Sequence, residues 1–340
     1  MRSSLTDIVL RPVFTYSSVS VLAVSSALQS TPHEFHGPDL AGAWQLVSSL
    51  CARISTHGPI LHATGLRLDR AGELQEVACA DGWIVADPGL ESGWSYSATI
   101  ANSDPRVGTL LDLYMPLCVG EAARRMVVAH LAQSLDGRIA TNNGVSQFIS
   151  GHEDLEHTHR LRALVDAVIV GASTVEHDDP RLTTRLCPGA NPVRVVIDPR
   201  GRTTADRRLV DDTEARTIIV RGAGIDHAHD LDGEPVEIIE LETDDQGWLP
   251  VPSIIEALHA RGISRVMIEG GGLTVSRFLV AGLVDRLHLS VSPVIIGSGR
   301  PAFTFPEVFD LESVTQLQPR QFQLGRDVLF DCPLTSTSNQ

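Results

Sequence analysis

Three consecutive glycines, Gly270, Gly271 and Gly272, follow a short apolar run and the acidic residue Glu269. Residues from Thr274 onward have helical periodicity, so the glycines connect a strand to the first turn of a helix. Glycines allow the backbone to approach a ligand closely, and free amides at a helix N-terminus attract phosphate. The segment therefore indicates either a phosphate cradle or a plain strand-to-helix turn. Its spacing differs from the GxGxxG of the Rossmann dinucleotide fold.

Two other polar loops also follow predicted strands. The segment 132–140 contains Asp136-Gly137, which by itself would signal only a turn. The segment 171–185 combines hydroxyls, carboxylates and two arginines. Ligands of open α/β sheets bind at the carboxyl ends of the strands. We therefore expect these loops to line a ligand site.

The sequence pattern of the strands and helices that must position these loops changes near residue 123. From Arg124 onward, short apolar runs alternate with amphipathic helices, which is the pattern of strands covered on both faces. The predicted strands are 126–131, 167–170, 193–197, 217–220, 266–268 and 287–296, and the predicted helices are 155–164, 253–261 and 274–283. The earlier part predicts a helix over 38–54 and two strands around the turn Asp69–Gly72. We therefore expect a mostly parallel α/β domain over 123–334 and a smaller α+β domain over 1–122.

Composition excludes several function classes. The chain has no lysine, so all 27 residues counted as Lys+Arg are arginines. A Walker A loop, a Schiff-base enzyme and a protein kinase each need a lysine. The formal net charge of −15 argues against nucleic acid or an anionic membrane as a partner. A few clustered arginines could still bind a small anionic ligand.

The histidines and cysteines do not predict a metal site. The motif His33-Glu34-Phe35-His36 has no downstream cysteine pair. His152 and His157 are five residues apart and would diverge by about 140° around a helix, so they cannot share a zinc ion. The cysteines are odd in number and lack a CxxC pair, which predicts reduced thiols in a cytoplasmic protein: Cys51, Cys79, Cys118, Cys187 and Cys332.

The apolar stretch 19–28 is far shorter than the roughly 20 residues that cross a bilayer. Asp7, Arg11 and Pro12 interrupt the order of charge and apolar core that a signal peptide requires. The stretch therefore favours a buried β-strand over a signal peptide.

Five blocks occur in order between 131 and 299: LAQSLDGRIA, SQFISG, LRALVDAVIVGASTVEHDDPRLTTR, RVVID and VMIEGGGLTVSRFLVAGLVDRLHLSVSPVIIGSG. They closely resemble the reductase domain of the bifunctional riboflavin-biosynthesis deaminase/reductase family. The resemblance implies a dihydrofolate-reductase-like fold, a mixed sheet with helices on both faces, and a homodimer. It also implies that NADPH reduces the ribosyl group of a 5-phosphoribosylaminouracil to a ribityl chain.

The resemblance also implies roles for individual residues, but it does not imply the proton donor. The expected substrate-binding residues are Ser146, Arg162, Leu182, Arg185 and Glu269. The expected cofactor-binding residues are Ala132, Phe148, Thr174, Asp178, Gly270, Gly271, Gly272, Leu273, Thr274, Val275, Ser276 and Arg277. Arginine guanidinium groups suit a phosphosugar, and the Glu269 carboxylate can accept hydrogen bonds from a pyrimidine edge or a sugar hydroxyl.

The chain departs from the family pattern at three places. Phe148 stands where the family often has tryptophan, and Pro199 stands where a serine often lies beside the adenosine phosphate. Arg200 and Arg202 are therefore the candidates for contacting a 2′-phosphate, and both are expected cofactor residues. The zinc motifs of the deaminase half are missing from residues 1–122, whose role the sequence does not indicate.

Two alternatives to the riboflavin-pathway reductase remain open at this point. The first is a reductase of a different pyrimidine or pterin-like metabolite, which the missing deaminase motifs make credible. The second is a non-catalytic nucleotide-binding or scaffold protein, in which the N-terminal domain binds a partner. The glycine loop and the arginines Arg162 and Arg185 favour the reductase.

Overall fold

The computed structural model describes residues 39–90, 92–97, 100, 104–119, 124–147, 149–225, 231, 235–310 and 314–334. The expected strand at 19–28 and the motif at 33–36 lie outside these residues. Among the helices within the described ranges, none is long and apolar enough to cross a bilayer.

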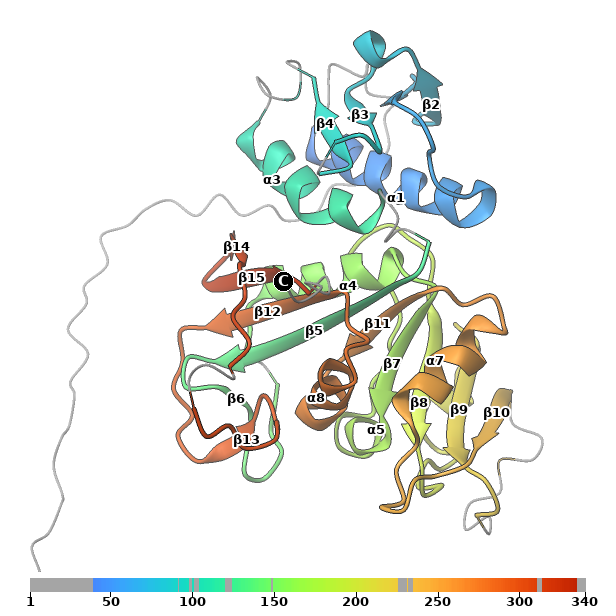
Figure 1. The fold of residues 1–340 in the computed structure, drawn as a ribbon, viewed down its shortest axis with the longest axis vertical. Helices are drawn as coiled ribbons and strands as arrows, with labels where there is room; N and C mark the ends of the chain where they lie inside the picture. Colours follow the sequence, from blue (N-terminus) through green and yellow to red (C-terminus); the bar gives the residue numbers. More distant parts are fainter. Residues whose placement is uncertain are drawn as a thin grey trace, which may run out of the picture. The chain divides into compact units, whose positions relative to one another are not determined.

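The larger sheet has nine strands in the order β10-β9-β8-β7-β11-β5-β12-β15-β14 (Figure 1). Neighbouring strands from β10 to β12 are parallel, and β15 and β14 add antiparallel pairs at one edge. The bounds are β5 Met126–Ser134, β7 Ala167–Gly171, β8 Val193–Asp198, β9 Thr217–Gly222, β10 Val236–Leu241, β11 Arg265–Glu269, β12 Arg286–Ser292, β14 Arg320–Leu324 and β15 Asp327–Pro333. The mixed sheet that the sequence predicts is confirmed.

Helices cover both faces of this sheet. Alternate residues of the central strands pack into two separate apolar cores, as the two-residue period of a strand requires. One core includes Leu161 of α4 and Leu209 of α6, and the other includes Leu258 of α7 and Phe278 of α8. The helices are α4 His152–Ala163, α5 Ala172–Asp178, α6 Arg208–Asp211, α7 Val251–His259 and α8 Gly272–Val280. A separate two-stranded ribbon pairs β6 Arg138–Thr141 with β13 Gly299–Pro301.

The earlier part of the chain forms a smaller antiparallel sheet, in the order β2-β1-β3-β4, accompanied by helices (Figure 1). Its elements are α1 Leu40–His57, β1 Thr64–Leu68, β2 Leu74–Val77, η1 Cys79–Asp81, β3 Ile84–Ala86, β4 Trp94–Tyr96, α3 Pro105–Tyr114 and η2 Met115–Leu117. Asp39 caps α1 by accepting a hydrogen bond from the Gly42 amide at 2.7 Å. We call residues 39–119 the appended segment. A domain boundary after residue 122 stays a prediction.

The appended segment packs on the side of the large sheet that carries α4. Its core residues, such as Trp44 and Leu111, belong to the same apolar cluster as Leu161. The Trp44 indole donates a hydrogen bond to the Pro188 carbonyl at 2.9 Å. The Tyr114 hydroxyl lies 2.8 Å from Nδ1 of His157 in α4. The appended segment is therefore held by apolar packing and by polar contacts, of which the one from Tyr114 reaches helix α4.

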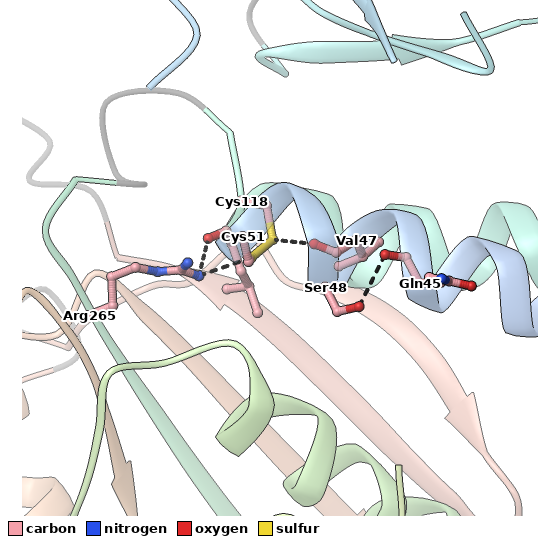
Figure 2. The surroundings of a disulfide bond; sticks show 7 residues. Gln45, Val47, Ser48, Cys51, Cys118 and Arg265 are labelled. Atoms are coloured by element: carbon pink, nitrogen blue, oxygen red, sulfur yellow. Dashed lines mark hydrogen bonds between the residues drawn. A yellow bond between two sulfur atoms is a disulfide. The ribbon is translucent and has the colours of Figure 1, made fainter. Parts of the chain in front are cut away.

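A disulfide joins Cys51 of α1 to Cys118, directly after η2 (Figure 2). The expectation that all five cysteines are reduced thiols is therefore wrong for this pair. The partners are 67 residues apart in sequence, but the packing of α1 against η2 brings their Cα atoms to 5.2 Å. The buried Arg265 guanidinium lies 3.3 Å from the Cys51 sulfur and donates to the Leu117 carbonyl at 2.8 Å (Figure 2).

Replacing both bonded cysteines, Cys51→Ala with Cys118→Ala, should lower the free energy of unfolding by about 2–4 kcal/mol, because the disulfide restricts the unfolded chain. Denaturant titration of the oxidised protein and the double variant measures the difference. Cys79→Ala, at an exposed free cysteine, is the control and should leave the midpoint unchanged. Equal midpoints for the double variant and the oxidised protein would contradict the prediction.

Candidate functional site

A cavity of about 820 Å³ lies at the carboxyl ends of β5, β7 and β11. Most of the residues that the sequence predicts for substrate and cofactor contribute to its wall. They are Ala132, Ser146, Arg162, Thr174, Asp178, Leu182, Arg185, Glu269, Gly270, Gly271, Gly272 and Leu273. The topology therefore brings together three loops that are far apart in sequence.

A second cavity of about 260 Å³ adjoins the first, because both are lined by Ser173, Thr174, Gly271 and Leu273. Its wall includes four further predicted cofactor residues, Arg200, Arg202, Thr274 and Arg277. Val275 and Ser276 line neither cavity: Val275 is in the apolar core, and the Ser276 hydroxyl donates to the Gly272 carbonyl at 2.6 Å. Phe148 lies outside the described residues.

An ion pair between Arg162 of α4 and Glu269 at the end of β11 lies in the wall of the large cavity. The Arg162 Nε donates to Glu269 Oε2 at 2.8 Å and its Nη2 donates to Oε1 at 2.5 Å. A third hydrogen bond runs from Nη1 to the Thr183 carbonyl at 2.8 Å. Burial alone would raise the pKa of Glu269, but the charge and hydrogen bonds of Arg162 outweigh it and hold that pKa below its usual value. Glu269 is therefore an ionised hydrogen-bond acceptor.

Because its guanidinium is held by Glu269, Arg162 is not the free phosphate-binding cation that its sequence position suggests. Arg185 is less committed, since its Nη1 donates to the Thr183 hydroxyl at 2.8 Å. Burial, followed by the neighbouring charges of Arg162 and Arg181, lowers the pKa of Arg185, although an arginine remains charged at neutral pH. A ligand anion would relieve this repulsion between arginines.

Leu182 has an unusual backbone conformation for a buried leucine. Its φ is +57°, in the left-handed region, and its side chain is 1% exposed. Such strain in a residue other than glycine persists only where the surrounding structure enforces it, and it is frequent at ligand sites. Its position in the wall of the large cavity agrees with that tendency.

The glycine loop connects β11 to α8, as the sequence predicts. Gly270 and Gly271 have φ values of +62° and +66°, which favour glycine. A Cβ at Gly272 would lie 2.5 Å from the Ala302 carbonyl oxygen, so this position has no room for a side chain. Among the described residues no side chain caps the N-terminus of α8. Its first amides are therefore available to an anion.

The wall of the second cavity contains the three predicted arginines together with Trp248, which sequence reasoning missed. The Arg277 guanidinium carbon lies 4.7 Å from the centre of the Trp248 ring, and that of Arg200 lies 6.0 Å from it. Arg202 instead donates to Glu176 at 2.8 Å and to Ser173 at 3.1 Å. Trp248 follows a turn after β10, and no local motif connects it to α8.

Sequence reasoning also missed three buried polar residues of the large cavity. His130 of β5 places its Nε2 3.2 Å from Asp154 Oδ1 of α4, and both residues line the cavity. His159 accepts the backbone N–H of Arg185 at 2.8 Å. Burial, followed by the charges of Arg162 and Arg185, lowers the pKa of His159 to about 4. The polar spacing of α4 resembles a solvated helix face, which concealed Asp154 and His159, whereas His130 stands alone in the apolar run of β5.

Known proteins match the part of the chain that contains both cavities. The family model described as "RibD C-terminal domain" matches residues 125–328. The 2,5-diamino-6-ribosylamino-4(3H)-pyrimidinone 5′-phosphate reductase of Methanothermobacter thermautotrophicus is 37% identical over 215 residues, which are 61% of this chain and 97% of that protein. The Archaeoglobus fulgidus protein of the same name is 35% identical over 202 residues, covering 56% of this chain and 88% of the relative.

The solved structure of a Thermotoga maritima diaminohydroxyphosphoribosylaminopyrimidine deaminase/5-amino-6-(5-phosphoribosylamino)uracil reductase is 28% identical, with a TM-score of 0.53. The match covers 67% of this chain and 61% of that bifunctional protein. The match to the Aquifex aeolicus riboflavin biosynthesis protein RibD, at 33% identity, covers 52% of this chain and 48% of that protein. The family that the sequence blocks resemble is confirmed, and the chain belongs to the RibD C-terminal domain family of reductases.

Proposed function

We propose that the chain is an NADPH-dependent reductase that converts a ribosylaminopyrimidine 5′-phosphate to its ribitylamino form. The observation that carries this proposal is the pair of adjoining cavities at the carboxyl ends of β5, β7 and β11. The larger cavity offers an ionised acceptor and arginines to a phosphosugar. The smaller cavity offers helix amides and an arginine cluster to a dinucleotide. The relatives named as pyrimidinone phosphate reductases support the substrate class.

The residues between the cavities fit a dinucleotide. A Cβ at Gly271 would lie 3.2 Å from the Thr174 hydroxyl oxygen, so this glycine leaves space that a side chain would fill. The pyrophosphate would bind Gly270–Gly272 and the first amides of α8. The nicotinamide end would lie near Ala132 and Thr174, and when bound it supplies the hydride for the reduction.

The residues of the large cavity would orient the ribotide. Arg185 would bind the 5′-phosphate, because its guanidinium is not paired with a carboxylate in the described structure. Glu269 would accept hydrogen bonds from a sugar hydroxyl or the pyrimidine edge, with Arg162 holding its carboxylate in place. Ser146, which donates to Asp178 at 3.2 Å, would complete the wall. Such fixed positioning accounts for a large share of the rate of a bimolecular reduction.

Preference for NADPH over NADH would come from Arg200 and Arg277 rather than from Arg202. Arg277 is oriented by Trp248, by donation to the Leu249 carbonyl at 3.2 Å and by a long ion pair with Asp244 at 3.9 Å, which leaves its remaining N–H groups for a phosphate. Arg202 is already engaged by Glu176. The phosphate contact that the family's serine makes at the position of Pro199 would therefore come from Arg200, which follows β8, and from Arg277 of α8.

The proposed activity is tested by mixing the purified chain with NADPH and a ribosylaminopyrimidine 5′-phosphate. NADPH should be consumed, and mass spectrometry should show a product that has gained two hydrogens. The dephosphorylated ribosylaminopyrimidine should react with a much higher KM, because it lacks the group that Arg185 would bind. Consumption of NADPH with a pterin but not with the ribotide would overturn the proposal.

Gly271→Val should weaken NADPH binding by at least about tenfold, equivalent to 1.4 kcal/mol, because the side chain fills the pyrophosphate site. Fluorescence titration with NADPH measures the Kd. Gly262→Val is the matched control: Gly262 also has a positive φ, +77°, but a Cβ added there would meet no atom within 4 Å, and the residue lines neither cavity. Equal affinities for the two variants would show that the loop is only a turn.

The double variant Arg200→Ala with Arg277→Ala should reduce the ratio of kcat/KM for NADPH to that for NADH by at least about tenfold, since only NADPH carries the 2′-phosphate. Steady-state kinetics with both cofactors gives this ratio. Arg202→Ala should change it little, because Glu176 already neutralises Arg202. A large change for Arg202→Ala and none for the double variant would reverse the assignment.

A further inference from the structure

His130 and Asp154 form a buried pair in the wall of the large cavity. His130 lies in the middle of β5, directly beside Glu269 in the register of β5 and β11. Its Nε2 is 3.2 Å from Asp154 Oδ1, and its Nδ1 is 3.5 Å from the Thr158 hydroxyl. Since Asp154 holds Nε2 and the contact to Thr158 is long, Nδ1 is the nitrogen available to a ligand.

The Asp154 carboxylate is buried and ionised. Its side chain is 1% exposed. Burial would raise its pKa, but the charge and hydrogen bond of His130, with a smaller contribution from His157, hold that pKa far below its usual value. A buried ionised carboxylate without a partner is costly. Asp154 therefore depends on the Nε2–H group of His130 as its hydrogen-bond partner.

Every element packed against His130 contributes a polar group. Asp154, His157 and Thr158 come from α4, Glu269 comes from β11, and His288 from β12 is its register neighbour. Burial, followed by the charge of His288, lowers the pKa of His157, and burial lowers that of His288. Asp154 and Glu269 are therefore the carboxylates next to His130.

The three other ionisable groups that are hydrogen-bonded to Arg162, Arg185 or His130 are unsuited to donating a proton. Glu269 is ionised because it is bound by Arg162. His159 uses Nδ1 to accept the Arg185 amide, and its pKa of about 4 leaves it neutral near pH 7. Asp154 is ionised for the reason given above. Within this hydrogen-bonded group, His130 is therefore the residue left to donate a proton.

We propose that His130, oriented by its hydrogen bond to Asp154, is the general acid of the reduction; this inference rests on the proposed function. Nδ1 donates its proton to the ribosyl ring oxygen as the bond from that oxygen to C1′ breaks. The lone pair of the exocyclic nitrogen forms a C1′=N bond, which is the bond then reduced by hydride. The neutral imidazole regains its proton from water, so one proton and one hydride are consumed per turnover.

His130→Asn should lower kcat by about 100-fold or more, with little change in the KM for the ribotide. Asp154→Asn should also lower kcat with little change in the KM, because the carboxylate that orients the His130 ring is lost. His152→Asn is the control on the same helix; His152 is exposed and does not line the cavity, so kcat should be unchanged.

NADPH affinity and the thermal midpoint show whether each variant is folded. If the unaltered protein reduces the ribotide and a folded His130→Asn variant keeps its kcat, the assignment of the general acid is overturned. If the unaltered protein does not reduce the ribotide at all, the proposed function fails instead. The two failures are therefore distinguishable.

Discussion

The ion pair between Arg162 and Glu269 connects helix α4 to the centre of the large sheet, and the geometry of the cavity depends on it. Both side chains are largely buried, with 8% and 19% of their surface exposed. Removing one partner of such a pair typically costs about 3–5 kcal/mol, because the other charge remains buried alone. The pair therefore fixes the distance between α4 and β11, which is the width of the site.

Helix α4 is held mainly by polar contacts. Five of its six buried residues are polar or charged: Asp154, His157, Thr158, His159 and Arg162. On one side these groups meet the sheet and the cavity. On the other side the appended segment contributes Tyr114, next to His157, and Trp44, whose ring lies 5.5 Å from the Arg160 guanidinium carbon. The appended segment thus supports the helix that forms one wall of the site.

The sequence predicted the elements whose signals are local. The apolar runs of the central strands and the glycines after β11 depend on neighbouring residues, so their pattern indicated both the sheet and the loop. Contacts between distant segments had no such signal. The disulfide joins residues 67 positions apart, Trp248 reaches Arg277 only through the fold, and Glu269 neutralises Arg162 across 107 positions. The polar face of α4 had the composition of a solvated helix and is instead buried.

The central claim is that the two cavities bring a nicotinamide and a ribosyl carbon into contact. The most direct test uses NADPH carrying deuterium at the transferred position of the nicotinamide, with mass spectrometric mapping of the product. We expect one deuterium at C1′ of the new ribityl chain, since hydride passes directly between the bound molecules. A product without deuterium, or with deuterium at another carbon, would contradict the claim.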